Sequence, residues 1–322
     1  MAEYLTNTSE LTAVADAIRE KGGTTAQLSY PAGFVSAISA IEAGGGGYTI
    51  DDIAERNMLN GSIYGSSASF VDRFAFFQAV SLTGADFPNV EEIRVGAFSY
   101  ASNLQTVSFP NATTIRQYAF TGCWSLVSFI GSKVTTLEQY AFANCRSMSF
   151  VQFDILQSVS ANAFESCYEL KIVNMPNVKS IGQAVFRNCN QLSEIAMPKV
   201  THISNSAFSQ CSKLKSISFP SATTISTGAF WGCTSLSEAY IPKVTSLGNQ
   251  VFSRNYNLLS VNLTSVTNVP TAGTNIFTST PIGGYTASTG GVYGSVYVPA
   301  SLYNSFLTAT NWSSISARIV SV

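Results

Sequence analysis

Phenylalanine recurs at intervals of 22 residues in this chain, and no other feature limits its fold so strongly. The members of the series are Phe76, Phe98, Phe120, Phe142, Phe164, Phe186, Phe208, Phe230 and Phe252. Such a period indicates an array of units, each too small to cover its own apolar face, so that neighbours must stack. A stacked array also lets a chain of 322 residues share one core, although compact cores stop growing near about 250 to 300 residues.

Further columns repeat with the phenylalanines. The third residue after Phe is cysteine in six consecutive units, and the sixth and seventeenth are always apolar, as at Leu126 and Leu137. Positions nine and eleven are apolar and alternate with mostly polar neighbours, which predicts a short strand with these two positions inward and positions eight and ten outward. A proline usually follows, and the residues before the next Phe suit a helical turn or a 3₁₀ segment.

The predicted fold is mainly β with short helical or 3₁₀ turns, a solenoid of 22-residue coils with a small helical hairpin at its N-terminus. The register extends backward to Ile63 and Val71, and at the other end Phe277 follows Phe252 by 25 residues. A loop rich in Gly, Thr and Ser then occupies 278–295, before a last strand and a helix. We divide the chain into a hairpin, a glycine linker, an N-terminal cap, the repeats and a C-terminal cap, at 1–43, 44–47, 48–75, 76–274 and 275–322.

The pattern Leu-x-x-Ile-x-Phe-Pro, together with Ala-Phe-x-x-Cys-x-x-Leu, resembles the leucine-rich repeats of the BspA-like family. The resemblance extends over residues 60–322 and includes the ending from Gly294 through Trp312, which is similar to the segment that closes such arrays. It implies a leucine-rich repeat solenoid. It also implies a function in surface attachment and in contact with a host or partner.

The cysteine column favours a structural role over chemistry. A zinc site needs ligands that converge on one point, whereas a column at one-coil spacing lines up its sulfurs. The Cα atoms of cysteines on adjacent coils are expected to lie near the lower end of the distance range for a disulfide. Buried thiols also act as small apolar side chains with a weak donor, and we expect them to be reduced. Catalysis would need a base, and the only histidine, His202, is expected to point outward beside an inward Ile203. The members of this structural ladder are Cys123, Cys145, Cys167, Cys189, Cys211 and Cys233.

Composition and motifs argue against several function classes. The chain has 17 basic and 18 acidic residues without a dense basic cluster, which argues against nucleic-acid and anionic-membrane partners. No run of about 18 apolar residues occurs, so no membrane insertion is expected. Glycine-rich phosphate loops, paired-histidine metal motifs and the G-x-S-x-G elbow are missing from the sequence. We therefore predict no enzymatic activity, no cofactor and no metal.

Residues 1–43 are predicted to be an adaptor. Two amphipathic helices are expected, the first at 9–21 and the second from Pro31, and the glycines at 44–47 separate them from the solenoid. The stretch 11–34 resembles the N-terminal segment of tail-associated proteins from phages and prophages of gut-type Firmicutes. The helices are expected to bind other tail proteins and to make the chain a homo-oligomer. The alternative is a dimerisation or capping element of a cytosolic interaction protein.

The outward positions of the strands form the candidate ligand surface. Most are small and polar, but Ile130, Phe150 and Ile172 occupy neighbouring coils. Clustered outward apolar residues are either a contact patch or shielded by a flanking loop, and both possibilities stay open. Trp124 and Trp231, on the turn side, pack locally or stack on a sugar, and local packing is favoured. The candidate ligand contacts are Ile130, Phe150, Gln152, Ile172, Asn174 and Tyr240.

Two functions fit these features. The first is a non-enzymatic recognition and attachment protein of a phage or prophage tail, which presents the solenoid to a surface protein or glycan of a bacterium. The sequence begins with neither the basic start nor the apolar run of an export signal, so this hypothesis expects assembly in the cytoplasm and a place in the virion. The alternative is a BspA-like adhesin or host-interaction protein at the bacterial cell surface, outside any virion.

Overall fold

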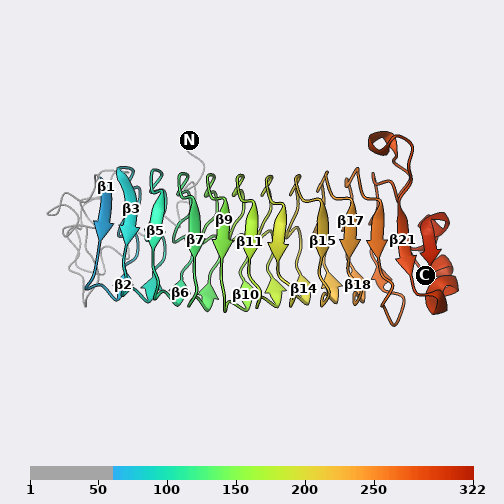
Figure 1. Cartoon of the computed structure of the whole chain (residues 1–322), viewed down its shortest axis with the longest axis horizontal. Helices are drawn as coiled ribbons and strands as arrows, with labels where there is room; N and C mark the ends of the chain where they lie inside the picture. Colours follow the sequence, from blue (N-terminus) through green and yellow to red (C-terminus); the bar gives the residue numbers. More distant parts are fainter. Residues whose placement is uncertain (1–60) are drawn as a thin grey trace, which may run out of the picture.

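The computed structural model describes residues 61–322, which wind into a long stack of coils (Figure 1). Each coil contributes one long and one short strand, and the strands of successive coils pair in parallel. The predicted solenoid of 22-residue coils is confirmed, since register partners such as Phe150 and Ile172 lie 22 residues apart. The predicted N-terminal hairpin, the glycine linker and the first part of the N-terminal cap lie outside the described residues.

The long strands form one face of the stack. Hydrogen bonding divides them into three sheets, in the orders β1-β3-β5, β13-β11-β9-β7 and β15-β17-β19-β21-β22. The interruptions follow β5 and β13, whose middle residues Val107 and Ile195 are only half-buried. The strands are β1 (Gly61–Tyr64), β3 (Leu82–Asp86), β5 (Thr106–Ser108), β7 (Ser128–Ile130), β9 (Phe150–Gln152), β11 (Ile172–Asn174), β13 (Glu194–Ala196), β15 (Ser216–Ser218), β17 (Glu238–Tyr240), β19 (Ser260–Asn262), β21 (Ser295–Val298) and β22 (Ile319–Ser321).

The short strands form a second ribbon along the stack, in sheets of four and six strands that are divided between β8 and β10. In β2 to β18 the second residue belongs to the apolar seventeenth column, and it points into the core at positions such as Ile181 and Ile225. The strands are β2 (Phe70–Val71), β4 (Glu92–Ile93), β6 (Thr114–Ile115), β8 (Thr136–Leu137), β10 (Ser158–Val159), β12 (Ser180–Ile181), β14 (His202–Ile203), β16 (Thr224–Ile225), β18 (Ser246–Leu247) and β20 (Thr271–Ala272).

The Phe column forms the spine of the core. Consecutive rings lie 4.8–5.9 Å apart between centroids, with interplanar angles of 2–18°. Phe277 extends this column by one ring despite its longer spacing. The apolar sixth, ninth and seventeenth columns surround the rings, so that one continuous core runs through the described chain. Each coil thereby covers an apolar face that its neighbour cannot bury alone.

The turns that carry Phe differ from the predicted helical or 3₁₀ segments. The residues two before and two after each Phe have left-handed backbone, as at Tyr140 with a φ of 57° and Asn144 with a φ of 60°. A helix needs right-handed dihedral angles throughout, so the segment is a series of single turns, and residues 61–286 contain no helix. The cause is hydrogen bonding between coils. The N–H groups of Phe142 and Asn144 donate to carbonyls of Ala163 and Glu165 in the next coil, each at 2.8 Å.

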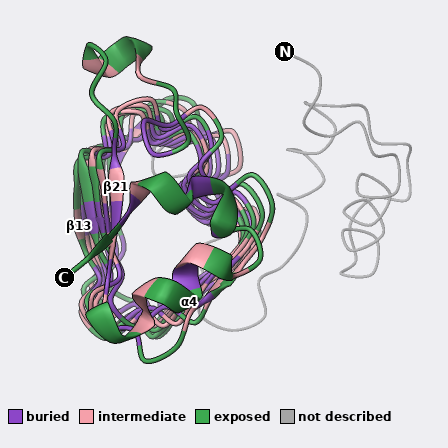
Figure 2. Cartoon of the chain, turned by 90° about the vertical axis from the view of Figure 1, so that its right-hand side faces the viewer, coloured by how far each residue is buried: buried purple, intermediate pink, exposed green. Residues whose placement is uncertain are grey.

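The C-terminal segment lies across the end of the stack (Figure 2). Trp312 packs on Phe277 with 6.2 Å between ring centroids, and its Nε1 donates to the carbonyl of Pro270 at 2.8 Å. The indole therefore covers the end of the Phe column while its own donor stays paired. The helices here are η2 (Ala300–Leu302), α4 (Tyr303–Thr308) and η3 (Ser313–Arg318), whereas η1 (Ala287–Thr289) lies before β21. None of the helices within 61–322 has the length and apolar character that crossing a bilayer requires.

The positions with left-handed backbone, two residues before and two after each Phe, predict which substitutions stabilise a coil. Gln250 is exposed and has a φ of 55°, a conformation that costs most residues roughly 1–2 kcal/mol and glycine very little. Gln250→Gly is expected to raise the free energy of unfolding by about 0.5–1 kcal/mol in urea denaturation, after the higher chain entropy of glycine is counted. Gln183 is exposed but not left-handed, so Gln183→Gly should lower the same free energy. Shifts of the same sign in both variants would contradict this account.

Candidate functional site

The long-strand face exposes the predicted outward rows. On β9, Val151 is buried while Phe150 and Gln152 on either side of it are partly exposed. The same alternation holds on β11 and β15, where Val173 and Ile217 are buried. Because successive side chains of a strand point to opposite faces, the eighth and tenth columns run along the outside of the stack.

Apolar side chains gather on three adjacent strands of this face. Ile130 on β7 and Ile172 on β11 are 57% and 37% exposed, and Phe150 on β9 is half-buried between their coils. Phe150 is the register partner of Ile172, whereas Ile130 pairs with Gln152 and is therefore diagonal to Phe150. Val127, just before β7, adds a further exposed apolar side chain. We name the following residues the outward patch: Val127, Ile130, Phe150, Gln152, Ile172 and Asn174.

The structure brings five of the six predicted contacts together and separates Tyr240 from them. Gln152 and Asn174 are register partners, and Gln152 Nε2 donates to Asp154 Oδ1 at 2.8 Å. Tyr240 is exposed but lies on β17, three coils beyond β11. At about 4.8 Å per coil, this places it about 14 Å along the stack from Asn174. Tyr240 is therefore an isolated aromatic side chain rather than a member of the outward patch.

No described segment shields the outward patch. The exposed fractions of Ile130 and Ile172 leave no room for a flanking loop from residues 61–322 over either side chain. Elsewhere on this face the outward residues are mostly small and polar, as at Ser216 and Ser218 of β15. An exposed apolar cluster in such surroundings is typical of a contact site.

Large side chains also line the corner between the turns and the long strands. Val127 and Tyr168 lie there and were not predicted from the sequence. The fourth column after Phe is outward and places Trp124, Arg146 and Tyr168 on consecutive coils. The Arg146 guanidinium lies 5.2 Å from the centroid of the Trp124 ring, and Trp231 has a comparable contact with Arg254 at 4.9 Å. Both tryptophans thus make cation–π contacts with the next coil. Large residues in the fourth and seventh columns were the signal that could have found this corner.

The cysteine column runs through the core beside the Phe rings. All six thiols are free and buried, and each donates to the carbonyl of the preceding coil's Phe, as from Cys167 to Phe142 at 3.2 Å. Burial raises the pKa of the Cys145 and Cys211 thiols well above the ordinary value, which keeps them protonated. His202 lies exposed on β14 and shares a hydrogen bond with Thr201. Within 61–322, no group of three or more His, Cys, Asp or Glu residues is arranged to hold a metal ion.

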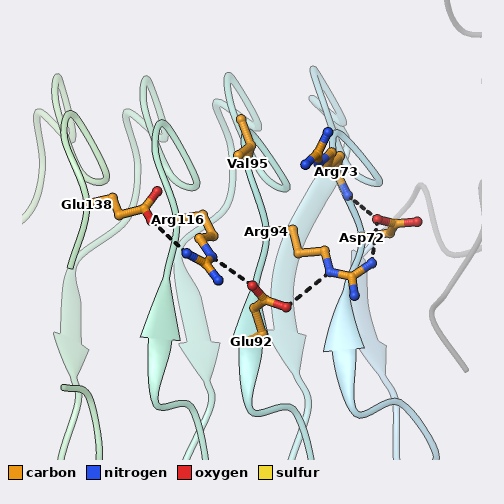
Figure 3. A pocket seen from close by; sticks show the side chains of 7 residues that line it. All are labelled: Asp72, Arg73, Glu92, Arg94, Val95, Arg116 and Glu138. Atoms are coloured by element: carbon orange, nitrogen blue, oxygen red, sulfur yellow. Dashed lines mark hydrogen bonds and ion pairs between the residues drawn. The ribbon is translucent and has the colours of Figure 1, made fainter. Parts of the chain in front are cut away.

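A chain of ion pairs crosses the first coils on the short-strand side (Figure 3). It runs from Asp72 through Arg94, Glu92 and Arg116 to Glu138, with N–O distances of 2.7–3.2 Å. With Arg73 and Val95, these residues line a concavity of about 660 Å³. Its guanidinium and carboxylate charges balance, and every carboxylate accepts a hydrogen bond from an arginine side chain. The arrangement therefore suits a structural role. Its signal in the sequence was the 22-residue spacing of Asp72, Arg94, Arg116 and Glu138.

The repeats of this chain match a known family model. A family model described as the BspA type leucine rich repeat region matches residues 69–193 and 157–284. No curated protein matches the chain. Among solved structures, a leucine rich cell surface protein from Faecalibacterium prausnitzii A2-165 is 26% identical, with 63% of this chain and 70% of that chain covered and a TM-score of 0.39.

Two further solved structures are similar. A leucine-rich repeat protein from Bacteroides ovatus ATCC 8483 is 18% identical, with 83% of this chain and 92% of that chain covered and a TM-score of 0.40. The leucine rich repeat protein of T. pallidum is 23% identical, with 61% and 74% covered and a TM-score of 0.37.

Burial predicts that the thiols do not react with alkylating reagents in the folded chain. Because the thiolate is the reactive form and burial disfavours it, iodoacetamide should label none of the six cysteines in native protein at neutral pH. All six should react once the chain is unfolded in urea, and mass spectrometry counts the labels. Labelling of any of the six cysteines under native conditions would contradict the burial of the cysteine column.

The ion-pair chain predicts a pH-dependent contribution to stability. Partial burial of Glu92 acts in the opposite direction, but hydrogen bonds from Arg116 and Arg94 prevail and lower the pKa of Glu92 below its ordinary value of 4.5. Its contribution is therefore complete above the unfolded pKa and is lost as the pH falls through the lower folded pKa. Glu92→Gln should reduce the free energy of unfolding at neutral pH, and the difference from wild type should shrink below pH 4.5.

Urea denaturation at a series of pH values measures this difference. Glu169 is exposed and has no ion pair within the described chain, so Glu169→Gln is the matched control and should follow the wild type at every pH. A Glu92→Gln difference that stayed constant with pH would show that charge on this carboxyl does not stabilise the fold.

Proposed function

Because the chain belongs to the BspA-type leucine-rich repeat family, we propose that it is a non-enzymatic recognition protein whose outward patch binds a ligand on a bacterial surface. The observation that carries the proposal is the cluster of Ile130, Phe150 and Ile172 on a face of mostly small polar residues. Repeat arrays present extended surfaces for binding, and exposed apolar clusters mark contact sites.

The stack supports recognition by holding these side chains in place. Strands β7, β9 and β11 pair with one another in strict register, so the outward side chains are positioned before a ligand arrives. Little ordering is then needed on binding, which leaves more of the contact energy for affinity. Ile130 and Ile172 offer apolar area, while the amides of Gln152 and Asn174 can donate to and accept from a polar group. This combination suits a surface protein or glycan.

We place this recognition in a phage or prophage tail. The support is the resemblance of residues 11–34 to the N-terminal segment of tail-associated proteins. On this proposal, residues 1–43 bind other tail proteins and make the chain a homo-oligomer, and the chain is assembled in the cytoplasm into the virion. The alternative is a BspA-like adhesin or host-interaction protein at the bacterial cell surface, which the family membership supports as well.

Mass spectrometry of purified particles and of cell-wall fractions separates these two settings. Recovery of the chain in particles, after induction of the strain that encodes it, would support the tail. Recovery in the cell-wall fraction together with absence from particles would support the adhesin. Both results would leave the recognition function in place, because it rests on the outward patch.

The double variant Phe150→Ser with Ile172→Ser should weaken binding to intact cells of the encoding species by about tenfold or more, since one large apolar side chain contributes about 1.5–3 kcal/mol when buried. Titration of cells with labelled full-length protein measures the affinity. Both residues point outward, so the thermal melting temperature should change little.

Val320→Ser is the matched control for this experiment. Val320 lies on β22 at the end of the long-strand face and is 37% exposed, as is Ile172. Its removal should leave cell binding unchanged. Equal affinity of the double variant and the wild type would overturn the assignment of the outward patch.

A further inference from the structure

One loop leaves the regular outline of the coils. Residues 283–294 project from the stack just before β21, as both views along and across the stack show (Figures 1 and 2). The loop lengthens its coil, because Ser260 pairs with Ser295, 35 residues later, whereas Glu238 on the preceding long strand pairs with Ser260, 22 residues later. Insertions into regular repeats map to loops on one face, often the face that binds, and long loops in compact scaffolds are usually functional.

The first and last residues of the loop, Gly283 and Gly294, lie very close to backbone atoms of other segments. A Cβ atom on Gly283 would lie 2.1 Å from the carbonyl oxygen of Phe277, and one on Gly294 would lie 2.6 Å from that of Leu258. The Gly283 N–H also donates to Thr280 Oγ1 at 3.0 Å. Only glycine fits at these two positions, so the loop leaves and rejoins the stack at fixed points.

Hydrogen bonds also hold the interior of the loop. The N–H of Gly291 donates to the carbonyl of Thr286 at 3.1 Å, and Thr289 Oγ1 donates to the carbonyl of Val292 at 2.6 Å. Ser288 Oγ donates to the carbonyl of Tyr256 in the coil beneath. The loop therefore has a defined shape without a partner, which lowers the ordering cost of binding.

The surface of the loop has the chemistry of a binding loop. Val292, Tyr293 and Tyr285 are 56%, 50% and 41% exposed. Arg318 lies 3.6 Å from the centroid of the Tyr293 ring, and the Tyr285 ring lies 5.3 Å from that of Tyr256. Residues 283–294 contain no Asp, Glu, Lys, Arg or His and are dominated by Gly, Tyr, Ser and Thr. Antibody paratopes have this composition, in which tyrosine supplies rigid contact area and the small residues adapt their hydrogen bonds.

We propose that loop 283–294 is a second contact site, which enters an uncharged cleft of a folded protein. A projecting loop meets its partner by entering a concave surface, as long paratope loops do. Residues 283–294 offer a buried ion of the partner no countercharge, and the charged group that contacts the loop, the Arg318 guanidinium, lies over the Tyr293 ring. We therefore expect the cleft to lack strong charge. Folded proteins carry such clefts, whereas an extended glycan does not. The proposal rests on the proposed function only in taking the chain to be a recognition protein, and it is independent of the outward patch.

The test is binding of the full chain to intact cells of the encoding species, with Val292→Ser and Tyr293→Ala combined. We expect affinity to fall about tenfold or more, since two exposed apolar anchors are removed from one contact. The matched control combines Val80→Ser with Tyr64→Ala at the opposite end of the stack, where the same residue types are 52% and 59% exposed. This control should bind as the wild type does. Both variants should stay folded, with melting temperatures close to that of the wild type, because the substituted side chains are at least 50% exposed.

Treatment of the cells identifies the partner. Protease shaving should abolish the loop-dependent part of the binding, and periodate oxidation of glycans should spare it. Loss after periodate but not after protease would overturn the protein partner. Equal binding of the loop variant and the wild type would overturn the loop proposal while leaving the recognition function standing. Wild-type chain that binds no cells at all would overturn both.

Discussion

Each coil of this protein depends on its neighbours for its core and for its hydrogen bonds. A single coil has one Phe ring and a few aliphatic side chains, and the face they form is covered only when the next coil stacks on it. The left-handed residues on both sides of Phe turn alternate N–H groups toward the next coil, as at Phe142 and Asn144. The inward columns are constrained by both requirements at once, whereas the outward columns and inserted loops can vary without loss of the core.

The same constraint explains why the cysteine thiols are buried and the charged side chains of the first coils are paired. The third column lies beside the Phe rings, where a small side chain fits and where a thiol can donate to the Phe carbonyl of the preceding coil. The charged side chains on the first coils neutralise one another along the stack, as Glu92 does with Arg94 and Arg116. The two proposed sites offer a ligand apolar contact and uncharged polar groups. The outward patch and loop 283–294 supply these at two separate places, one on the strands and one on an inserted loop.

Much of the fold was accessible from the sequence, and the parts that were not have identifiable reasons. Burial repeats with the coil, so the inward columns stand out, and Ile63 and Val71 indeed pair one coil away with Ala85 and Ile93. The left-handed columns were missed because they hold Tyr, Gln, Ser and Ala as well as Gly and Asn, and only the last two indicate such backbone by their type. In the candidate site, Ile130, Phe150 and Ile172 were accessible because they break a polar row. Tyr168 was not, because the orientation of the turn columns was unknown.

Counting along the chain was enough to order the neighbours along the stack, because a shift of one coil carries each residue onto the residue 22 positions later. It was also enough to assign the strand positions to the inside or the outside, since burial alternates along a strand. Counting along the chain did not show which residues of one coil lie close to residues at other positions of the same or the next coil. The turn-side corner beside the long strands, the diagonal placement of Ile130 and Phe150, and the projection of loop 283–294 depend on the path of the backbone within one coil. That path follows from hydrogen bonds between coils. These bonds join backbone groups, which every residue type carries, so the amino-acid sequence does not reveal them.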